Sequence, residues 1–157
     1  MRNNHLRRRI LEIVSKSGEG HIPSSFSIVD ILNCLYSEVL HFDRRNPLSP
    51  ERDRFILSKG HGAAALYVVL EAHGLLESSV VDSYGSSLSP LGGHPDSTRI
   101  SFVEASTGSL GHGMPIAVGI ALAEKIKEST VDTYCLIGDG ESQEGTTWEA
   151  ALIAANR

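Results

Sequence analysis

The chain has 157 residues, of which 41% are apolar and 21% charged, so it can bury one core and shows no compositional sign of disorder. Its formal net charge of -5 argues against a general nucleic-acid or anionic-membrane surface, and we interpret the basic start MRNNHLRRR as a solvated helix end. No apolar stretch approaches the roughly 18 residues of a spanning helix, and the run after the basic start is too short for a signal sequence. We expect one soluble, cytoplasmic domain that binds neither nucleic acid nor membrane.

Hydrophobic periodicity predicts several helices along the chain. Apolar residues within 6–14 recur at helical spacing, and the pattern fades at Gly18. Segment 26–40 is apolar almost all round, which favours a buried helix with Ser24 or Ser25 as its N-cap. Further helices are predicted at 63–74, 116–129 and 146–156.

Short apolar runs between these helices are typical of buried strands. The candidates are 54–58, 100–105 and 131–138. Because strands alternate with helices, we expect an α/β fold in which flanking helices cover a mostly parallel sheet.

Histidines gather in the glycine-rich loops. Four of the seven directly follow a glycine: His21, His61, His94 and His112. A glycine lets the backbone approach a ligand closely, and loops at the carboxyl ends of parallel strands are where α/β proteins bind ligands. Each pair is weak evidence by itself, but together they favour a polar ligand that carries phosphate or hydroxyl groups.

Asp139 stands between two glycines, directly after an apolar run and just before a predicted helix. Its carboxylate should project from the sheet edge beside free backbone N–H groups. This arrangement suits a Mg²⁺ or Ca²⁺ ion that bridges a diphosphate, because the carboxylate can ligate the ion while the N–H groups contact phosphate oxygens. An ordinary acidic turn is the alternative, because the chain has neither a P-loop nor a GxGxxG fingerprint that opens a helix after its first strand.

Five segments resemble motifs of the transketolase family in order and approximate spacing. They are GHIPSSFSIVDIL, DRFILSKGHGAAALY, GGHPD, STGSLGHGMPIAVGIALA and LIGDGESQEGTTWEAA. They look most like the N-terminal subunit of split, two-polypeptide transketolases, and the resemblance runs from about Leu6 to Ala155. It implies a thiamine-diphosphate-binding fold, with residues 1–157 as the N-terminal part, and so an incomplete half, of the diphosphate-binding domain.

The resemblance implies a role for each matching position. Asp139 matches the aspartate that ligates Mg²⁺ on the diphosphate of thiamine diphosphate, and Gly140 matches a glycine that touches that diphosphate. His61 corresponds to a histidine near the diphosphate, whereas His21 and His94 correspond to histidines that face the donor and acceptor sugars. The loop along the thiazolium ring corresponds to Gly108, Leu110, Gly111 and His112. Glu144 resembles a glutamate at the dimer interface that couples two active sites.

Two departures from the family pattern stand out. Position 112 is histidine where the family usually has glutamine, which puts that contact to cofactor or sugar in doubt. The family's second metal ligand, an asparagine, would lie beyond Arg157, and Asn156 comes too early to replace it. We therefore expect partner chains: one that supplies the rest of the diphosphate-binding domain and one that supplies the pyrimidine-binding domain.

The implied activity is transfer of a two-carbon ketol unit from a ketose donor to an aldehyde acceptor, with a sugar or sugar phosphate as substrate. This chain alone should be catalytically incomplete. Around Trp148 and 150–155, the last predicted helix should expose an apolar face for a partner. Two other hypotheses stay open: a non-catalytic scaffold protein, and a metal-dependent hydrolase built on Asp139, Glu141, Glu144 and the loop histidines.

Overall fold

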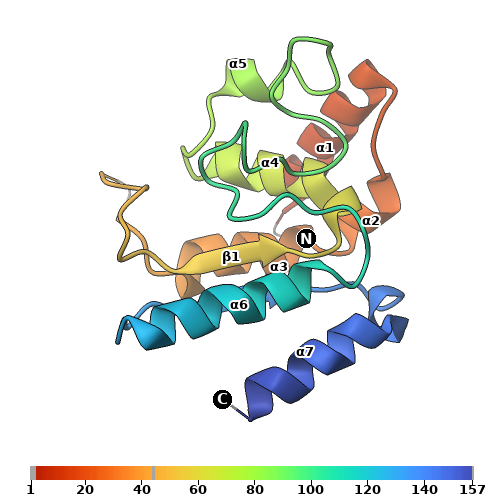
Figure 1. Cartoon of the computed structure of the whole chain (residues 1–157). Coiled ribbons are helices and arrows are strands. Elements are labelled where there is room, and N and C mark those ends of the chain that lie inside the picture. The colour runs from red at the N-terminus through yellow and green to blue at the C-terminus, as the bar shows by residue number, and fades with distance from the viewer. Residues whose placement is uncertain (1–2, 44, 157) are drawn as a thin grey trace.

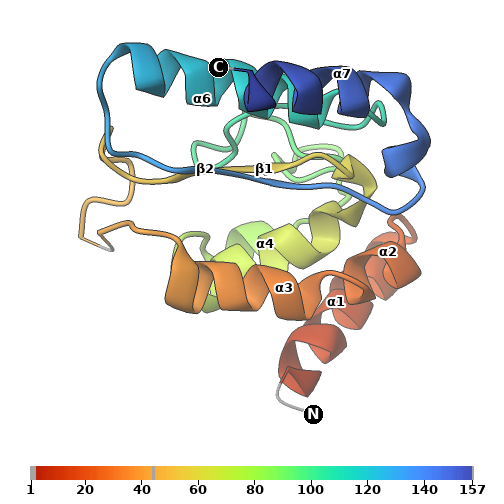
Figure 2. The same ribbon diagram turned by 90° about the horizontal axis from the view of Figure 1, so that it is seen from below.

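The computed structural model describes residues 3–43 and 45–156. Its elements form three layers, with a parallel sheet between two groups of helices (Figures 1 and 2). On one face of the sheet lies α6 (Gly113–Ile126), with α7 (Gly145–Ala155) packed beside it. On the other lie α1 (Asn4–Ser17), α2 (Ile22–Phe26), α3 (Val29–Cys34) and α4 (Ala63–Ala72). The expected α/β fold with a parallel sheet and flanking helices is confirmed.

Helix α1 ends where the sequence predicts. Gly18 has a φ of 70°, in the left-handed region that suits glycine, and its N–H donates to the carbonyl of Val14 at 2.9 Å. The apolar side of the helix packs into the core through Leu6, Ile10, Ile13 and Val14.

The predicted single helix at 26–40 is wrong in its start and in its burial. The chain turns into α2 at Ile22, because Pro23 in the first turn is already set to a helical φ and needs no N–H partner there. Ser24 and Ser25 therefore lie inside α2, and neither is an N-cap. The following helix α3 continues into a π-helical turn over Leu35–Val39, and α3 exposes Ile31 to solvent.

The sheet in the described part of the chain has two parallel strands, β1 (Arg54–Leu57) and β2 (Thr133–Leu136). Their register pairs Arg54 with Thr133 and Leu57 with Leu136. Two of the three predicted strands are thus confirmed. The third, 100–105, is wrong: it folds as turns, since the N–H of Val103 bonds to the carbonyl of Ile100 at 3.1 Å.

The core lies mainly between the sheet and α4. Every residue from Ala63 to Leu70 is buried, and the short helix α5 (Ser78–Val81) adds Val81 to the same cluster. Ile100 and Val103 are buried in this core as well, so the segment supplies apolar side chains to the core from turns rather than from a strand. No helix in the described ranges is both long and apolar enough to cross a membrane.

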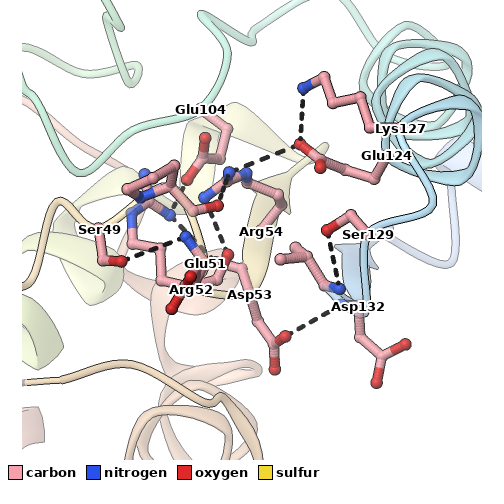
Figure 3. Close-up of polar contacts among 12 residues, drawn as sticks. Ser49, Glu51, Arg52, Asp53, Arg54, Glu104, Glu124, Lys127, Ser129 and Asp132 are labelled. Atoms are coloured by element: carbon pink, nitrogen blue, oxygen red, sulfur yellow. Dashed lines mark hydrogen bonds and ion pairs between the residues drawn. The ribbon is translucent and has the colours of Figure 1, made fainter.

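A polar network fixes the amino ends of both strands (Figure 3). The buried carboxylate of Asp53 accepts hydrogen bonds from the backbone N–H groups of His41, at 2.9 Å, and Asp132, at 3.0 Å. Arg52 pairs with Glu104, and Arg54 lies 3.5 Å from a carboxylate oxygen of Glu124 on α6. These contacts lie at the opposite edge from the glycine-rich loops.

Candidate functional site

The loops after the two strands lie at one edge of the sheet, because the strands are parallel. After β1, the chain forms a single 3₁₀ turn over Gly60–Gly62 and enters α4. After β2, it passes through 137–140 into a second 3₁₀ turn, Glu141–Gln143. The start of α2 and the loop 107–113 complete this edge.

Three of the four glycine-flanked histidines gather at this edge. The rings of His21 and His61 meet edge to face, with centroids 5.6 Å apart. Partial burial lowers the pKa of His61, and the nearby Lys59, His21 and His94 lower it further, so the neutral imidazole is favoured. His94 is exposed and its ring packs against the backbone of Gly108, where an added Cβ would lie 3.1 Å from Cδ2.

The loop 107–113 is held by close backbone contacts. Gly60 allows one of them, since a Cβ at that position would lie 2.5 Å from the carbonyl oxygen of Thr107. Gly111 has a φ of 79°, and its carbonyl accepts a hydrogen bond from the hydroxyl of Thr146 at 2.8 Å. A Cβ at Gly111 would also lie 2.7 Å from Cβ of Glu144, so this loop contacts the predicted interface glutamate directly.

His112 does not join the other histidines. It is exposed immediately before α6, and its Nδ1 lies 3.0 Å from the carbonyl oxygen of Leu110. The ring therefore bonds within its own loop.

Asp139 is exposed in the loop after β2, next to Gly140. Among the hydrogen bonds between described residues, none uses the backbone N–H of Asp139 or Gly140. The space beside Gly140 is open, with no atom within 4 Å of an added Cβ. An exposed carboxylate beside two unused N–H donors fits a cation together with an anionic ligand. No group of three potential side-chain metal ligands occurs among the residues that the structure describes.

Lys59 is a functional candidate that the sequence reasoning missed. It lies two residues after the end of β1 at Leu57, is only 6% exposed, and its ammonium lies 3.2 Å from the hydroxyl of Ser27. Burial lowers the pKa of Lys59, while the carboxylates of Asp139 and Glu141 oppose that shift. The sequence signal that could have pointed to Lys59 is a charged residue just after an apolar run that predicts a buried strand.

Glu141 is also buried, with 1% of its surface exposed. Its carboxylate accepts hydrogen bonds from the backbone of Gly111 and Gly138 and from the hydroxyl of Ser58. Because both of its oxygens are already used inside the protein, Glu141 is not placed as the free metal ligand that the hydrolase hypothesis required.

Helix α7 exposes the apolar face expected from the sequence. Trp148 is 62% exposed, Leu152 66% and Ile153 50%. An apolar groove adjoins this helix, lined by α6, β2 and Ala154. Exposed apolar clusters of this kind mark interfaces in many proteins.

The fold and the site together define an α/β protein whose strand-end loops offer histidines, a cation, free N–H groups and a carboxylate to a polar ligand. Residues 2–157 match the family model described as transketolase, thiamine diphosphate binding domain. The chain belongs to this family, and the resemblance noted in its sequence is confirmed.

Relatives and solved structures agree with that assignment. The chain is 42% identical over 146 residues to an apulose-4-phosphate transketolase subunit of Phocaeicola vulgatus, covering 93% of this chain and 52% of the relative. It is 42% identical over 154 residues to 6-deoxy-6-sulfo-D-fructose transketolase subunit SqwG of Clostridium sp., covering 98% and 56%. The transketolase of Leishmania mexicana superposes with a TM-score of 0.85 at 31% identity, covering 94% of this chain and 24% of that one.

The chain thus spans about half the length of the two transketolase subunits from Phocaeicola vulgatus and Clostridium sp.. Both relatives are named as transketolase subunits, which agrees with the type of transketolase that the sequence motifs indicated.

Proposed function

We propose that this chain, residues 1–157, is the diphosphate-binding part of a thiamine-diphosphate-dependent transketolase that moves a two-carbon ketol unit from a ketose to an aldehyde. The observation that carries the proposal is the convergence of three glycine-flanked histidines and the Asp139 loop on one edge of the sheet. Family membership and the transketolase relatives support it.

Asp139 is the proposed side-chain ligand of Mg²⁺ or Ca²⁺ in this chain, and the backbone of Gly140 the proposed contact to the diphosphate. The backbone N–H groups of Asp139 and Gly140, which donate no hydrogen bond among the described residues, and the open space beside Gly140 support both roles. His61 lies next to the buried ammonium of Lys59, which adds positive charge near the proposed diphosphate position. The loop that contains Gly108, Leu110 and Gly111 is proposed to lie along the thiazolium ring.

When bound, thiamine diphosphate would supply the carbon nucleophile needed for reaction at the ketose carbonyl. The residues of this chain then have to orient the sugar and exchange protons with its hydroxyl groups. His21 and exposed His94 are the proposed groups for this work, because an imidazole can both donate and accept a proton at neutral pH. His112 is a weaker candidate for a ligand contact, since its Nδ1 is already engaged by Leu110.

The substrate is proposed to be a sugar or sugar phosphate, and the site of action the cytoplasm. The names of the relatives, which mention apulose 4-phosphate and a sulfo-sugar, support a modified sugar as donor or acceptor. The proposed partners are transketolase-type polypeptides that carry the remainder of the diphosphate-binding domain and the pyrimidine-binding domain. Glu144, beside Gly111 and at the start of α7, is the proposed contact to them.

Calorimetry tests the proposal. Mg²⁺ and thiamine diphosphate are titrated into the chain alone and into the chain co-purified with the polypeptides encoded beside it, and ketol transfer is then assayed with sugar phosphates. We expect saturable, metal-dependent binding in the assembly and transfer that requires it. An assembly that forms but binds no cofactor would instead support the scaffold hypothesis.

A further inference from the structure

The side chain of Glu141 has no role in the proposed function above, yet it is among the most buried polar groups of the site. It stands two residues after Asp139, at the start of the second 3₁₀ turn. Two of its hydrogen-bond partners, Ser58 and Gly111, lie far away in the sequence, whereas Gly138 is only three residues before it, so its position depends largely on the tertiary structure.

The two carboxylate oxygens of Glu141 divide their partners between two loops. Oε1 accepts from the N–H of Gly111, at 2.8 Å, and from the hydroxyl of Ser58, directly after β1. Oε2 accepts from the N–H of Gly138, at 3.1 Å, in the loop that carries Asp139. One side chain thereby joins the loop 107–113 to the loop 137–140.

Only a group with two acceptor oxygens can make this connection. A buried carboxylate with three donors is well satisfied, and its hydrogen bonds are stronger than those between neutral groups. A glutamine side chain has one acceptor oxygen and one NH₂ donor, so it would place a donor against one of the two backbone N–H groups. The result would be a displaced loop on one side or the other.

We infer that Glu141 is a positioning residue that fixes the loop 107–113 and the Asp139 loop relative to each other, so that both ends of the cofactor are received in one geometry. This inference rests on the proposed function, in which Asp139 and Gly140 receive the diphosphate and Gly108 to Gly111 lie along the ring. A ligand that touches both loops depends on their relative position. A ligand that touches only the diphosphate loop does not.

The test compares two ligands and three variants in the assembly in which the wild type binds. Dissociation constants are measured for thiamine diphosphate and for inorganic pyrophosphate, each with Mg²⁺, and unfolding midpoints are recorded in parallel. The variants are Glu141→Gln, which breaks the connection between the loops, and Ser58→Ala, which removes a hydrogen bond to the same carboxylate but leaves both loop contacts. Glu77→Gln is the matched control, because Glu77 is exposed and its side chain caps nothing.

Glu141→Gln should weaken thiamine diphosphate at least about tenfold, the order expected when a buried N–H loses its acceptor, and pyrophosphate much less. Ser58→Ala should lower the unfolding midpoint but change both affinities by less than about threefold, because the hydrogen bond that it removes lies outside the two loops. Unchanged thiamine diphosphate affinity in Glu141→Gln, or equal losses for both ligands, would overturn the inference. A wild type that binds neither ligand would overturn the proposed function itself, which is a distinguishable result.

If Glu141→Gln does not fold, amide hydrogen exchange in the wild type decides the matter. The N–H groups of Gly111 and Gly138 should then open in one shared event, with the same dependence on denaturant, because they bond to one carboxylate. Independent opening of the two amides would contradict a common positioning residue.

Discussion

At the scale of single residues, the site brings basic side chains and a carboxylate together. Lys59 and His61 are both disfavoured as cations by burial, while Asp139 is an exposed anion beside them. The backbone N–H groups of Asp139 and Gly140 add further positive potential without a titrating group. Such an arrangement is suited to an anion and a metal ion that arrive together.

Asp139→Asn tests the metal-ligand role. The substitution keeps the shape of the side chain but removes its charge, so Mg²⁺-dependent binding of thiamine diphosphate in the assembly should weaken by about tenfold or more, equivalent to ~1.4 kcal/mol. Calorimetry at several Mg²⁺ concentrations measures this. Asp132→Asn, with an exposed side chain at the far end of β2, is the control, and an unchanged affinity for Asp139→Asn would remove Asp139 from the metal site.

His21→Ala and His94→Ala test the proposed sugar contacts. Both variants should keep the wild-type affinity for the cofactor while turnover falls by something like 100-fold, the usual scale for loss of a proton-transfer group. Steady-state ketol transfer and cofactor titration are measured on the same preparations, with His5→Ala on the exposed side of α1 as control. Loss of cofactor binding would place these histidines at the diphosphate instead.

The electrostatic environment of His61 can be tested through its pKa, without any ligand. Because the folded state lowers this pKa, the ring should be neutral in the folded chain at a pH where the unfolded chain is already protonated. Stability that His61 contributes at neutral pH is therefore lost as the pH falls from above the ordinary value of 6.5 towards the folded pKa. NMR titration of the ring protons should give a midpoint below 6.5 that rises in Lys59→Met but not in Lys127→Met.

At the scale of elements, the sequence predicted those parts whose signals are local. Gly18 closes α1 because a left-handed residue is required there, and the apolar run at 54–57 is a strand because it is buried on both faces. The segment 100–105 shows the limit of such reasoning, since its buried apolar residues Ile100 and Val103 lie in turns packed on the core. Glu141 shows the same limit in the site, because its partner Ser58 lies 83 positions away.

Asp53→Ala tests the polar network at the amino ends of the strands. The change leaves the N–H groups of His41 and Asp132 without their acceptor, so the free energy of unfolding should fall by about 2 kcal/mol. Urea denaturation measures it. Asp132→Ala is the matched control, because its backbone N–H is retained and its side chain is exposed; an equal loss in both variants would argue against the network.

At the scale of the whole molecule, the two faces of the sheet differ in what covers them. The helices α1 to α4 form a closed apolar core, whereas α7 leaves Trp148, Leu152 and Ile153 open to solvent. The proposed partner chain would bury this surface and, through Glu144 and Thr146, also contact the segment that holds Gly111. Assembly and cofactor affinity should therefore be thermodynamically linked.

Leu152→Gln tests that link. The variant should fold, because the side chain is 66% exposed, but it should bind the proposed partner subunits more weakly and need more partner to reach full cofactor affinity. Analytical ultracentrifugation and cofactor titration across partner concentrations measure the two effects. Leu88→Gln removes an equally apolar side chain that is 92% exposed elsewhere, and a similar loss there would show that the α7 face is not specific.

The parallel register of β1 and β2 also governs the order in which the molecule is built. Arg54 pairs with Thr133, so β1 has left the ribosome long before its neighbour exists, and it gains no strand partner from the described residues until β2 is synthesised. Pairings so distant in sequence close slowly and expose strand edges meanwhile. During translation, the helices on the α4 face can assemble early, while the loop of Asp139 takes shape only after β2 has docked. A nascent chain should thus acquire its core well before its site, and stalled chains that end within α6 should be compact yet unable to bind the cofactor.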